Sequence, residues 1–222
     1  MAPPRECRAR VLAVRAPAPD IVEADLGMRE PDTLVFEAGQ WVSVPFGPKV
    51  VRAYSIASPP YASRMITLCA DVAPGGIGSA WFRSLAPGTD VVFKGPLGGF
   101  VFARADARRP LFVAEEIGIV PVRSMLTHLY ATGFGRASTL VYGASGSPLY
   151  DREFTSLARR YPAFSYHPVP AAALACAVES VVNAVDSLVA YVAGGEATIR
   201  RVREALMAKG LERRAVKWEK FW

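Results

Sequence analysis

The sequence predicts a two-domain protein in which a small antiparallel barrel or sandwich precedes a doubly wound α/β domain. Three observations predict this class. The length of 222 residues is comfortable for two domains of ordinary size. Up to about Ala103, short apolar runs are cut by proline and glycine at close spacing, as in small all-β domains. Beyond the charged stretch 104–109, apolar runs alternate with segments of helical period, so we place the domains at 1–105 and 106–222.

The strands predicted for both domains are short runs of apolar and β-branched residues bounded by turn residues. In the first domain they cover 9–14, 41–44, 53–56, 65–70 and 90–94. In the second domain they cover 111–114, 139–143, 164–168, 188–193 and 215–218, which predicts a five-stranded parallel sheet.

Four helices are predicted between the strands of the second domain, each from an apolar stripe at helical spacing. In the first helix, Pro121 suits the first turn, and the second begins at Ser147 and Pro148, which suit a cap and a first turn. The third lies within 171–188, and the fourth ends at Gly210. The stripes are Val122, Met125, Leu126 and Leu129; Phe154, Leu157, Ala158 and Tyr161; Leu174, Val178, Val181 and Val185; and Ile199, Val202 and Leu206.

Composition excludes several classes of protein. With 51% hydrophobic and 21% charged residues, the chain lies outside the disordered class. Its longest uncharged apolar run, 168–178, is shorter than the about 20 residues of a membrane span, and no signal peptide is recognisable. Cys7, Cys69 and Cys176 are too few and too widely spaced for a disulfide framework, a zinc pattern or a four-thiolate iron–sulfur cluster. We expect a cytoplasmic protein.

The net charge of +6 arises mainly near the end of the chain. This basic segment is either a solvated helix face or a docking surface for an acidic partner or an anionic cofactor. No nucleic-acid reader motif accompanies it, and His128 and His167 lack a second metal ligand at suitable spacing, so we predict neither nucleic-acid binding nor a metal site. The basic residues are Arg200, Arg201, Arg203, Lys209, Arg213, Arg214, Lys217 and Lys220.

The predicted strand at 53–56 follows Arg52 and carries Tyr54 and Ser55. Arg52 and Tyr54 share one face of a strand, where the ring could stack on a flat ligand and the guanidinium could bind its phosphate. The alternative is an ordinary strand with a surface arginine and a structural tyrosine.

A glycine-rich turn, Gly75-Gly76-Ile77-Gly78-Ser79, leads into an apparent helix start. Backbone N–H groups at such a start form a ready site for phosphate. The alternative is a plain loop with Ser79 as the helix cap.

The order of these pieces resembles the ferredoxin–NADP reductase superfamily. The likeness comprises Ala38-Gly39-Gln40-Trp41, then 52–58 fitting RxYSxxS, then Gly75-Gly76 with Ser79, then Gly95-Pro96-Leu97-Gly98. It continues with 117–121, 140–144, 191–194 and the terminal Glu219-Lys220-Phe221-Trp222. The resemblance implies a flavin-binding antiparallel β-barrel followed by a doubly wound five-stranded parallel sheet.

The resemblance also implies roles for the residues that match. Arg52 would pair with a flavin phosphate, Tyr54 would pack on the isoalloxazine and Ser55 would sit by its reactive nitrogen. The turn from Gly75 through Ile77 and Gly78 to Ser79 would cradle a pyrophosphate, which favours FAD, with FMN as the alternative. Phe221 and Trp222 would cover the other flavin face, although a terminal tryptophan could equally be packed core. The implied catalytic residues are Tyr54, Ser55 and Trp222.

The second domain departs from the family pattern where a pyridine nucleotide should bind. The retained candidates are Gly118, Pro121, Gly143 and Gly194. The family's GGTGIAP loop here has Glu115 and Glu116 in place of its two first glycines, and its CGP motif begins with Ala193 instead of cysteine. A carboxylate about 4 Å from a phosphate costs on the order of 4 kcal/mol at an effective dielectric of ~20, so NAD(P)H binding is in question.

We therefore predict an FAD-containing oxidoreductase that passes electrons between NAD(P)H and a separate redox partner, an iron–sulfur protein or an oxygenase or dehydrogenase subunit. The alternative is a flavin-holding electron-transfer or assembly subunit of a larger complex, in which Glu115, Glu116 and Ala193 mark a degenerate NAD(P)H site. A third alternative is a non-redox interaction module whose barrel holds no flavin.

Overall fold

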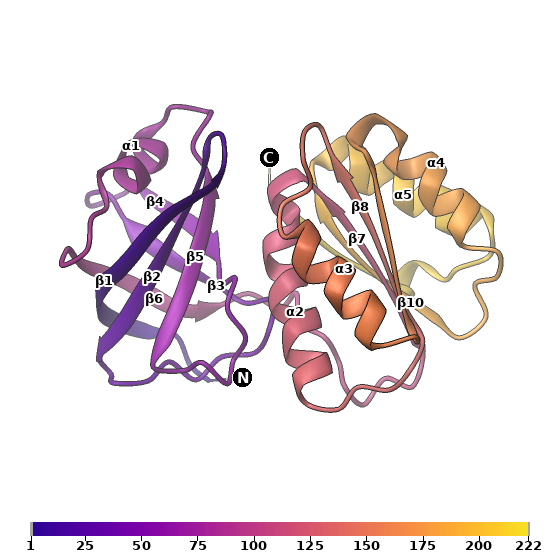
Figure 1. Ribbon diagram of the computed structural model, residues 1–222, viewed down its shortest axis with the longest axis horizontal. Coiled ribbons are helices and arrows are strands. Elements are labelled where there is room, and N and C mark those ends of the chain that lie inside the picture. Colours follow the sequence, from indigo (N-terminus) through magenta and orange to yellow (C-terminus); the bar gives the residue numbers. More distant parts are fainter. Residues whose placement is uncertain (1, 222) are drawn as a thin grey trace. The chain divides into compact units, whose positions relative to one another are not determined.

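The computed structural model describes residues 2–221 and divides the chain into two compact units (Figure 1). The first unit joins the chain up to Phe102 with Arg123–Thr132, and the second joins Ala103–Val122 with the chain from Gly133 onward. No helix among the described residues is long and apolar enough to cross a membrane.

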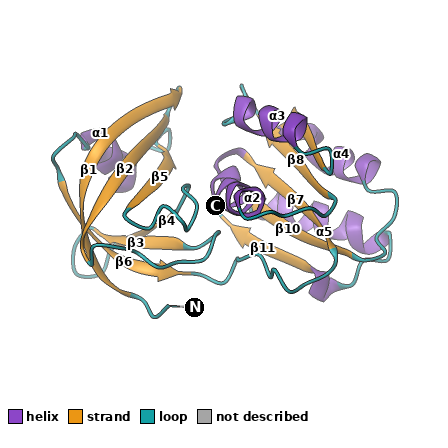
Figure 2. Cartoon of the chain, turned by 60° about the horizontal axis from the view of Figure 1, so that its bottom comes forward, coloured by secondary structure: helices purple, strands orange, loops and turns teal. Residues whose placement is uncertain are grey.

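The first unit is a six-stranded antiparallel sheet in the order β4-β3-β6-β1-β2-β5 (Figures 1 and 2). A bridge between Ile56 and Leu68 links the end of β4 to β5, so the two outer strands meet and the sheet closes into the predicted barrel. The strands are β1 (Arg5–Ala18), β2 (Ile21–Glu30), β3 (Trp41–Pro45), β4 (Val51–Ser55), β5 (Met65–Asp71) and β6 (Asp90–Leu97).

Strand β2 was not predicted, because acidic residues interrupt its apolar pattern. Glu23 is buried and Asp25 is largely buried, and both form ion pairs with Arg15 on the neighbouring strand β1. Asp25 also accepts a hydrogen bond from the Thr67 hydroxyl on β5. Partners on the neighbouring strands thus stabilise carboxylates at positions with little exposure. Without these partners, the acidic residues of this segment are typical of a loop.

The barrel core consists of aliphatic and aromatic side chains from all six strands, together with Phe82 of helix α1 (Ile77–Ser84). Phe82 is fully buried. Burying a side chain of this kind stabilises the folded protein by about 1.5 to 3 kcal/mol relative to leaving it exposed to water. Its burial fixes α1 against the barrel and thereby fixes the glycine-rich turn that precedes the helix.

The second unit is a parallel sheet in the order β11-β10-β7-β8-β9 (Figure 2). Leu174 and Val178 of α4 share a core with Val202 of α5 and with the strand residues Val113 and Val192. From β7 onward the elements of the chain are β7 (Arg109–Glu115), η1 (Glu116–Gly118), α2 (Ile119–Ala131), β8 (Ser138–Ala144), α3 (Asp151–Arg160), β9 (Phe164–Pro170), η2 (Ala171–Ala173), α4 (Leu174–Val181), β10 (Leu188–Gly194), α5 (Glu196–Ala208), η3 (Arg213–Ala215) and β11 (Val216–Lys220). Helix α2 belongs to the first unit from Arg123 onward. The predicted fold class is confirmed.

Two helix boundaries differ from the sequence prediction. Helix α2 begins at Ile119, which places Pro121 in its first turn as predicted. Helix α3 begins at Asp151, well after Ser147 and Pro148, because Tyr150 adopts the left-handed conformation with φ 62° and cannot belong to the helix. Helix α4 ends at Val181, before the predicted Val185, where two adjacent β-branched valines and an asparagine disfavour further helix.

Strand order places a topological switch point between β7 and β10. From β7 the chain proceeds to β8 and β9 on one side of the sheet, and then crosses to β10 and β11 on the other. In doubly wound sheets, ligands bind in the crevice outside the carboxyl ends of the strands at such a point. The residues that end β7 and β10 therefore define the candidate site of this unit.

Candidate functional site

In the barrel, strand β4 and helix α1 bring the predicted flavin residues together. A Cβ atom added to Gly78 would overlap the Tyr54 hydroxyl and would lie 3.5 Å from Cγ of Arg52. The RxYS strand and the glycine-rich turn therefore form one surface, although Tyr54 and Gly78 are more than 20 residues apart in the sequence. A separation of ~20 residues is longer than any local turn.

The Tyr54 side chain has an unusual environment for a half-buried tyrosine. Its ring stacks on Trp81 with centroids 5.7 Å apart and meets the edge of Phe82 at 4.8 Å. Its hydroxyl oxygen is buried and has no hydrogen-bond partner among the described residues, and burial raises the pKa of the phenol. An O–H donor without an acceptor costs about 1 to 3 kcal/mol, so this atom is suited to a hydrogen bond with a bound ligand.

The start of α1 carries no capping side chain. Gly76 occupies the N-cap position, its residue type offers no side-chain oxygen, and the first turn contains no acidic residue. Within the described chain, no atom lies within 4 Å of the position that a Cβ of Gly76 would take. The exposed N–H groups and the open space beside them suit a phosphate, and the exposed guanidinium of Arg52 is the nearby cation.

The alternative in which Ser79 caps this helix is wrong. Ser79 lies inside α1 and is buried, while Gly76 holds the cap position. The residues of the turn thus leave the helix start free for an anion, and the fit to a flavin phosphate rests on that arrangement together with the unpaired Tyr54 hydroxyl.

Ser55 and Ser58 have different environments within the same motif. Ser55 is buried at the end of β4, opposite Trp41 of β3. Ser58 accepts a hydrogen bond from the Thr67 amide at 3.0 Å, and its carbonyl accepts one from the Ser124 hydroxyl at 2.7 Å. Arg123 donates to the carbonyl of Ala57 at 3.2 Å. The last serine of RxYSxxS therefore fixes the backbone.

Sequence reasoning missed three residues around this surface. Trp81 supplies the ring against Tyr54, while Arg123 and Ser124 hold the last two residues of the motif, Ala57 and Ser58. The signal for Trp81 was its place one turn after the glycine-rich turn. Arg123 and Ser124 are 66 residues away from their partners and offered no local signal.

The terminal aromatic residues stay a prediction. Phe221 is half-buried, and its amide donates to the carbonyl of Gly194 at 3.0 Å, which continues the pairing of β11 with β10. Trp222 lies outside the described residues.

At the switch point of the second unit, Glu115 bridges β7 and helix α5. Its Oε2 accepts a hydrogen bond from the Gly195 amide at 2.9 Å, and its Oε1 accepts one from the Thr198 hydroxyl at 2.6 Å. Gly195 is the N-cap of α5, so the carboxylate lies where the positive end of the helix dipole favours an anion. A Cβ on Gly194 would lie 2.8 Å from Cβ of Glu115.

Glu116 is held in a similar way on the other side of β7. Its Oε1 accepts a hydrogen bond from the Ser145 amide at 2.7 Å, and its carbonyl accepts one from the Tyr142 hydroxyl at 3.2 Å. Its φ of 47° lies in the left-handed region that favours glycine. The sequence predicts that the two carboxylates hinder a phosphate in this loop, and in the structure both accept hydrogen bonds from backbone amides.

The retained nucleotide candidates have packing roles in this structure. A Cβ on Gly118 would lie 2.5 Å from the carbonyl oxygen of Ala193, and one on Gly143 would lie 3.0 Å from Leu174. Pro121 is buried within α2. These residues and Gly194 would be required by the fold with or without a nucleotide.

Glu219 is a titratable group of the terminal motif to which the sequence assigned no role. It pairs in register with Ala193 across β10 and β11, and its Oε2 is buried without a hydrogen-bond partner among the described residues. Burial raises the pKa of this carboxyl to about 7. The carboxyl is therefore poised to exchange a proton near neutral pH.

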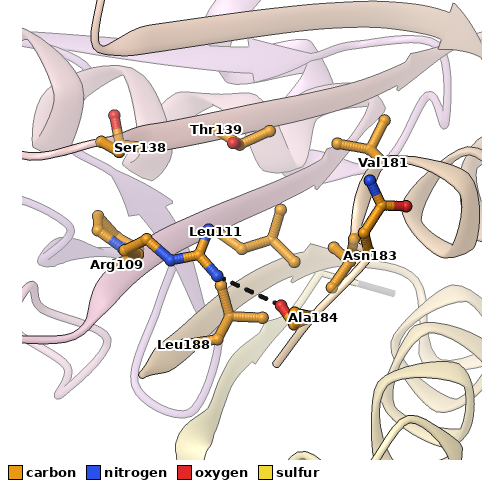
Figure 3. Close-up of a pocket in the computed structure, with 11 residues that line it drawn as sticks. Arg109, Leu111, Ser138, Thr139, Val181, Asn183, Ala184 and Leu188 are labelled. Atoms are coloured by element: carbon orange, nitrogen blue, oxygen red, sulfur yellow. Dashed lines mark hydrogen bonds between the residues drawn. The ribbon is translucent and has the colours of Figure 1, made fainter. Parts of the chain in front are cut away.

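A separate cavity of about 220 Å³ lies at the opposite end of the second sheet (Figure 3). It is bounded by the first residues of three strands, Arg109, Ser138 and Leu188, and Arg109 donates across it to the carbonyl of Ala184 at 3.3 Å. Because ligands of doubly wound sheets bind at the carboxyl ends of the strands, this cavity is not the candidate site.

The chain is similar to known oxidoreductases. Residues 10–102 match the family model of the oxidoreductase FAD-binding domain, which confirms the predicted FAD-binding barrel. The chain is 35% identical over 156 residues to ferredoxin–NADP reductase B of Sorangium cellulosum (strain So ce56), covering 68% of this chain and 64% of that protein. It is 30% identical over 216 residues to terephthalate 1,2-dioxygenase reductase component 2 of Comamonas sp., covering 91% of this chain and 64% of that protein.

The chain thus spans 64% of the length of these two curated relatives. Among solved structures, the Amycolatopsis cytochrome P450 reductase GcoB matches with a TM-score of 0.89 and 26% identity, covering 100% of this chain and 71% of that one. A ferredoxin NADP+ reductase from Neisseria gonorrhoeae with bound FAD and NADP matches in fold, with a TM-score of 0.80 and 16% identity.

Proposed function

The chain belongs to the ferredoxin–NADP reductase-like family of FAD-binding oxidoreductases, and on this premise we propose that it is a reductase that passes electrons from NAD(P)H through FAD to a separate redox protein. The observation that carries this proposal is the surface formed by β4 and α1. There, an uncapped helix start, an exposed guanidinium and an unpaired buried hydroxyl lie together.

Each residue of this surface has a proposed task toward FAD. Arg52 neutralises a phosphate, and the amides that follow Gly76 donate to the pyrophosphate. The Tyr54 ring, supported by Trp81, orients the isoalloxazine, and Ser55 donates toward its reactive nitrogen. When bound, FAD supplies the hydride and electron chemistry, while the protein sets its position and potential.

The proposed partner is an iron–sulfur protein or the oxygenase subunit that it serves. Support comes from the relatives whose names describe reductase components of oxygenases, such as that of terephthalate 1,2-dioxygenase. It also comes from the basic face of α5 and β11, where Trp218 is 51% exposed beside Arg200, Arg203 and Lys220. An acidic protein surface is the chemical complement of that face.

The proposal is tested by a visible absorption spectrum of the full chain after addition of FAD, followed by anaerobic titration with NADH and with NADPH. We expect a bound flavin spectrum that bleaches on titration. A protein that does not bind FAD would contradict the proposal.

Arg52→Ala should weaken FAD binding about 10- to 150-fold, which corresponds to about 1.5 to 3 kcal/mol for a charge-assisted hydrogen bond.

A second candidate function is favoured by the hydrogen bonds of Glu115 to Gly195 and Thr198. In it, the chain holds flavin but exchanges electrons only with partner proteins. A flavin that stays oxidised at millimolar NAD(P)H, yet is reduced by a reduced iron–sulfur protein, would select this function over the first.

A further inference from the structure

We propose that Glu115 and Glu116 are specificity-determining residues of the pyridine-nucleotide site. Their carboxylates accept hydrogen bonds from the backbone amides that the phosphates of a dinucleotide would otherwise use. This inference rests on the proposed function for the identity of the donor. Its consequence is a low affinity for ligands that carry a diphosphate at the switch point.

Glu115 lies at the crevice of the switch point. The crevice at a switch point lies between the carboxyl ends of two strands, here β7 and β10. Glu115 is the last residue of β7, and its carboxylate reaches the start of α5, the helix that follows β10. The side chain therefore crosses the crevice at the point where a ligand would enter it.

The Glu115 carboxylate is hydrogen-bonded at the start of α5 through both of its oxygens. The start of a helix attracts an anion through its free amides and its dipole, and at α5 this demand is met by Oε2 of Glu115 at Gly195. The second oxygen is held by Thr198 in the first turn of the same helix. Both oxygens of the carboxylate are thus engaged, so a phosphate could take this place only by displacing a bound carboxylate.

Glu116 repeats the arrangement at the neighbouring strand. Its carboxylate accepts from the amide of Ser145, the first residue after β8. It does so from a left-handed backbone conformation that favours glycine, so the carboxylate is present there despite an unfavourable backbone conformation. Two adjacent side chains therefore act as internal anions at loops that follow β8 and β10.

The test measures equilibrium binding of ADP-ribose, which carries the diphosphate and lacks nicotinamide, to the full chain by isothermal titration calorimetry. We expect weak binding to the natural protein and at least tenfold tighter binding to Glu115→Gln, which removes the charge and keeps the shape. Glu116→Gly should also bind more tightly, and its left-handed backbone suits glycine. The matched control is Glu204→Gln, an exposed glutamate on the same helix α5, which should bind as weakly as the natural protein.

Three outcomes would overturn the inference: tight binding by the natural protein that Glu115→Gln does not improve, equal gains in Glu115→Gln and Glu204→Gln, or no binding by any variant. In the last case the carboxylates would not be what excludes the ligand. If circular dichroism shows that Glu115→Gln or Glu116→Gly does not fold, the binding measured with the other of these two variants tests the inference. Because ADP-ribose binding needs no flavin, failure here is distinct from failure to bind FAD.

Discussion

At the scale of single residues, the clearest signature of a ligand in the barrel is the unpaired hydroxyl of Tyr54. Its oxygen is buried against the backbone of Gly78, and no acceptor lies within hydrogen-bonding reach among the described residues. Nothing in the stability of the empty barrel requires this hydroxyl, since phenylalanine would fill the same ring position between Trp81 and Phe82. The hydroxyl is therefore available to a bound group.

We predict that Tyr54→Phe separates stability from binding. Removal of a buried unpaired hydroxyl should stabilise the flavin-free protein by about 1 kcal/mol, measured by urea unfolding. The same change should weaken FAD binding about five- to tenfold, measured by quenching of flavin fluorescence, because one hydrogen bond is lost. Unchanged FAD affinity would show that the hydroxyl does not contact the flavin.

The Glu219 carboxyl predicts a specific dependence of stability on pH. Its pKa is about 7 in the folded protein against a reference value of 4.5, so between these values the folded state holds a proton that the unfolded state has lost. The stability associated with this proton is complete below about pH 4.5 and is lost as pH rises through 7.

Glu219→Gln should therefore match the natural protein near pH 4 and exceed its stability by about 3 kcal/mol near pH 8. The measurement is chemical unfolding at both pH values, with Glu204→Gln as an exposed control. A stability difference that stays constant across this range would refute the assignment.

At the scale of elements, glycine positions fix how η1 approaches β10. Gly118→Ala would bring a Cβ to 2.5 Å from the carbonyl of Ala193, a contact that only a backbone shift can relieve. We predict destabilisation by about 1 to 3 kcal/mol, as for other overpacked sites. The control is Gly135→Ala, where nothing in the described chain lies within 4 Å of the added Cβ. Equal thermal melts for the two variants would contradict this packing role.

Most of the elements were predictable from local patterns, and the failures have local causes. The buried strands β7, β8 and β10 are continuous apolar runs bounded by turns, so their sequence alone indicates them. Strand β2 was hidden because its carboxylates rely on Arg15, and the start of α3 was misplaced because the left-handed Tyr150 has no signature in sequence.

The candidate sites show the same division between local and distant information. The RxYS motif and the glycine-rich turn predicted a phosphate-binding surface, and the structure brings them together at Gly78. The sequence also drew attention to Glu115, but its hydrogen-bond partner Thr198 lies 83 residues away. Whether a carboxylate faces a ligand or caps a helix is decided by tertiary structure, and no spacing rule within the loop could have distinguished the two.

At the scale of the whole molecule, much of the net charge of +6 arises at the end of the chain, where residues 200–222 carry eight lysines and arginines against three glutamates. Lys220 is paired with Glu196 and Arg214 with Glu212, whereas Arg200, Arg201 and Lys217 are exposed and have no ion pair within residues 2–221. Unpaired cations beside the exposed Trp218 produce a positive field that steers an acidic protein toward this face.

This steering depends on the exposed cations Arg200 and Lys217. Arg200→Glu combined with Lys217→Glu should lower the second-order rate of electron transfer to an acidic iron–sulfur protein about tenfold at low ionic strength, measured by stopped-flow absorbance. Arg152→Glu combined with Arg159→Glu changes the net charge equally on α3, which packs on β9 at the other edge of the sheet. If net charge alone governed association, the two pairs would slow the reaction alike. If the face of α5 and β11 receives the partner, only the first pair should do so, and its effect should disappear at about 0.5 M salt, where charges more than a few ångströms apart are screened.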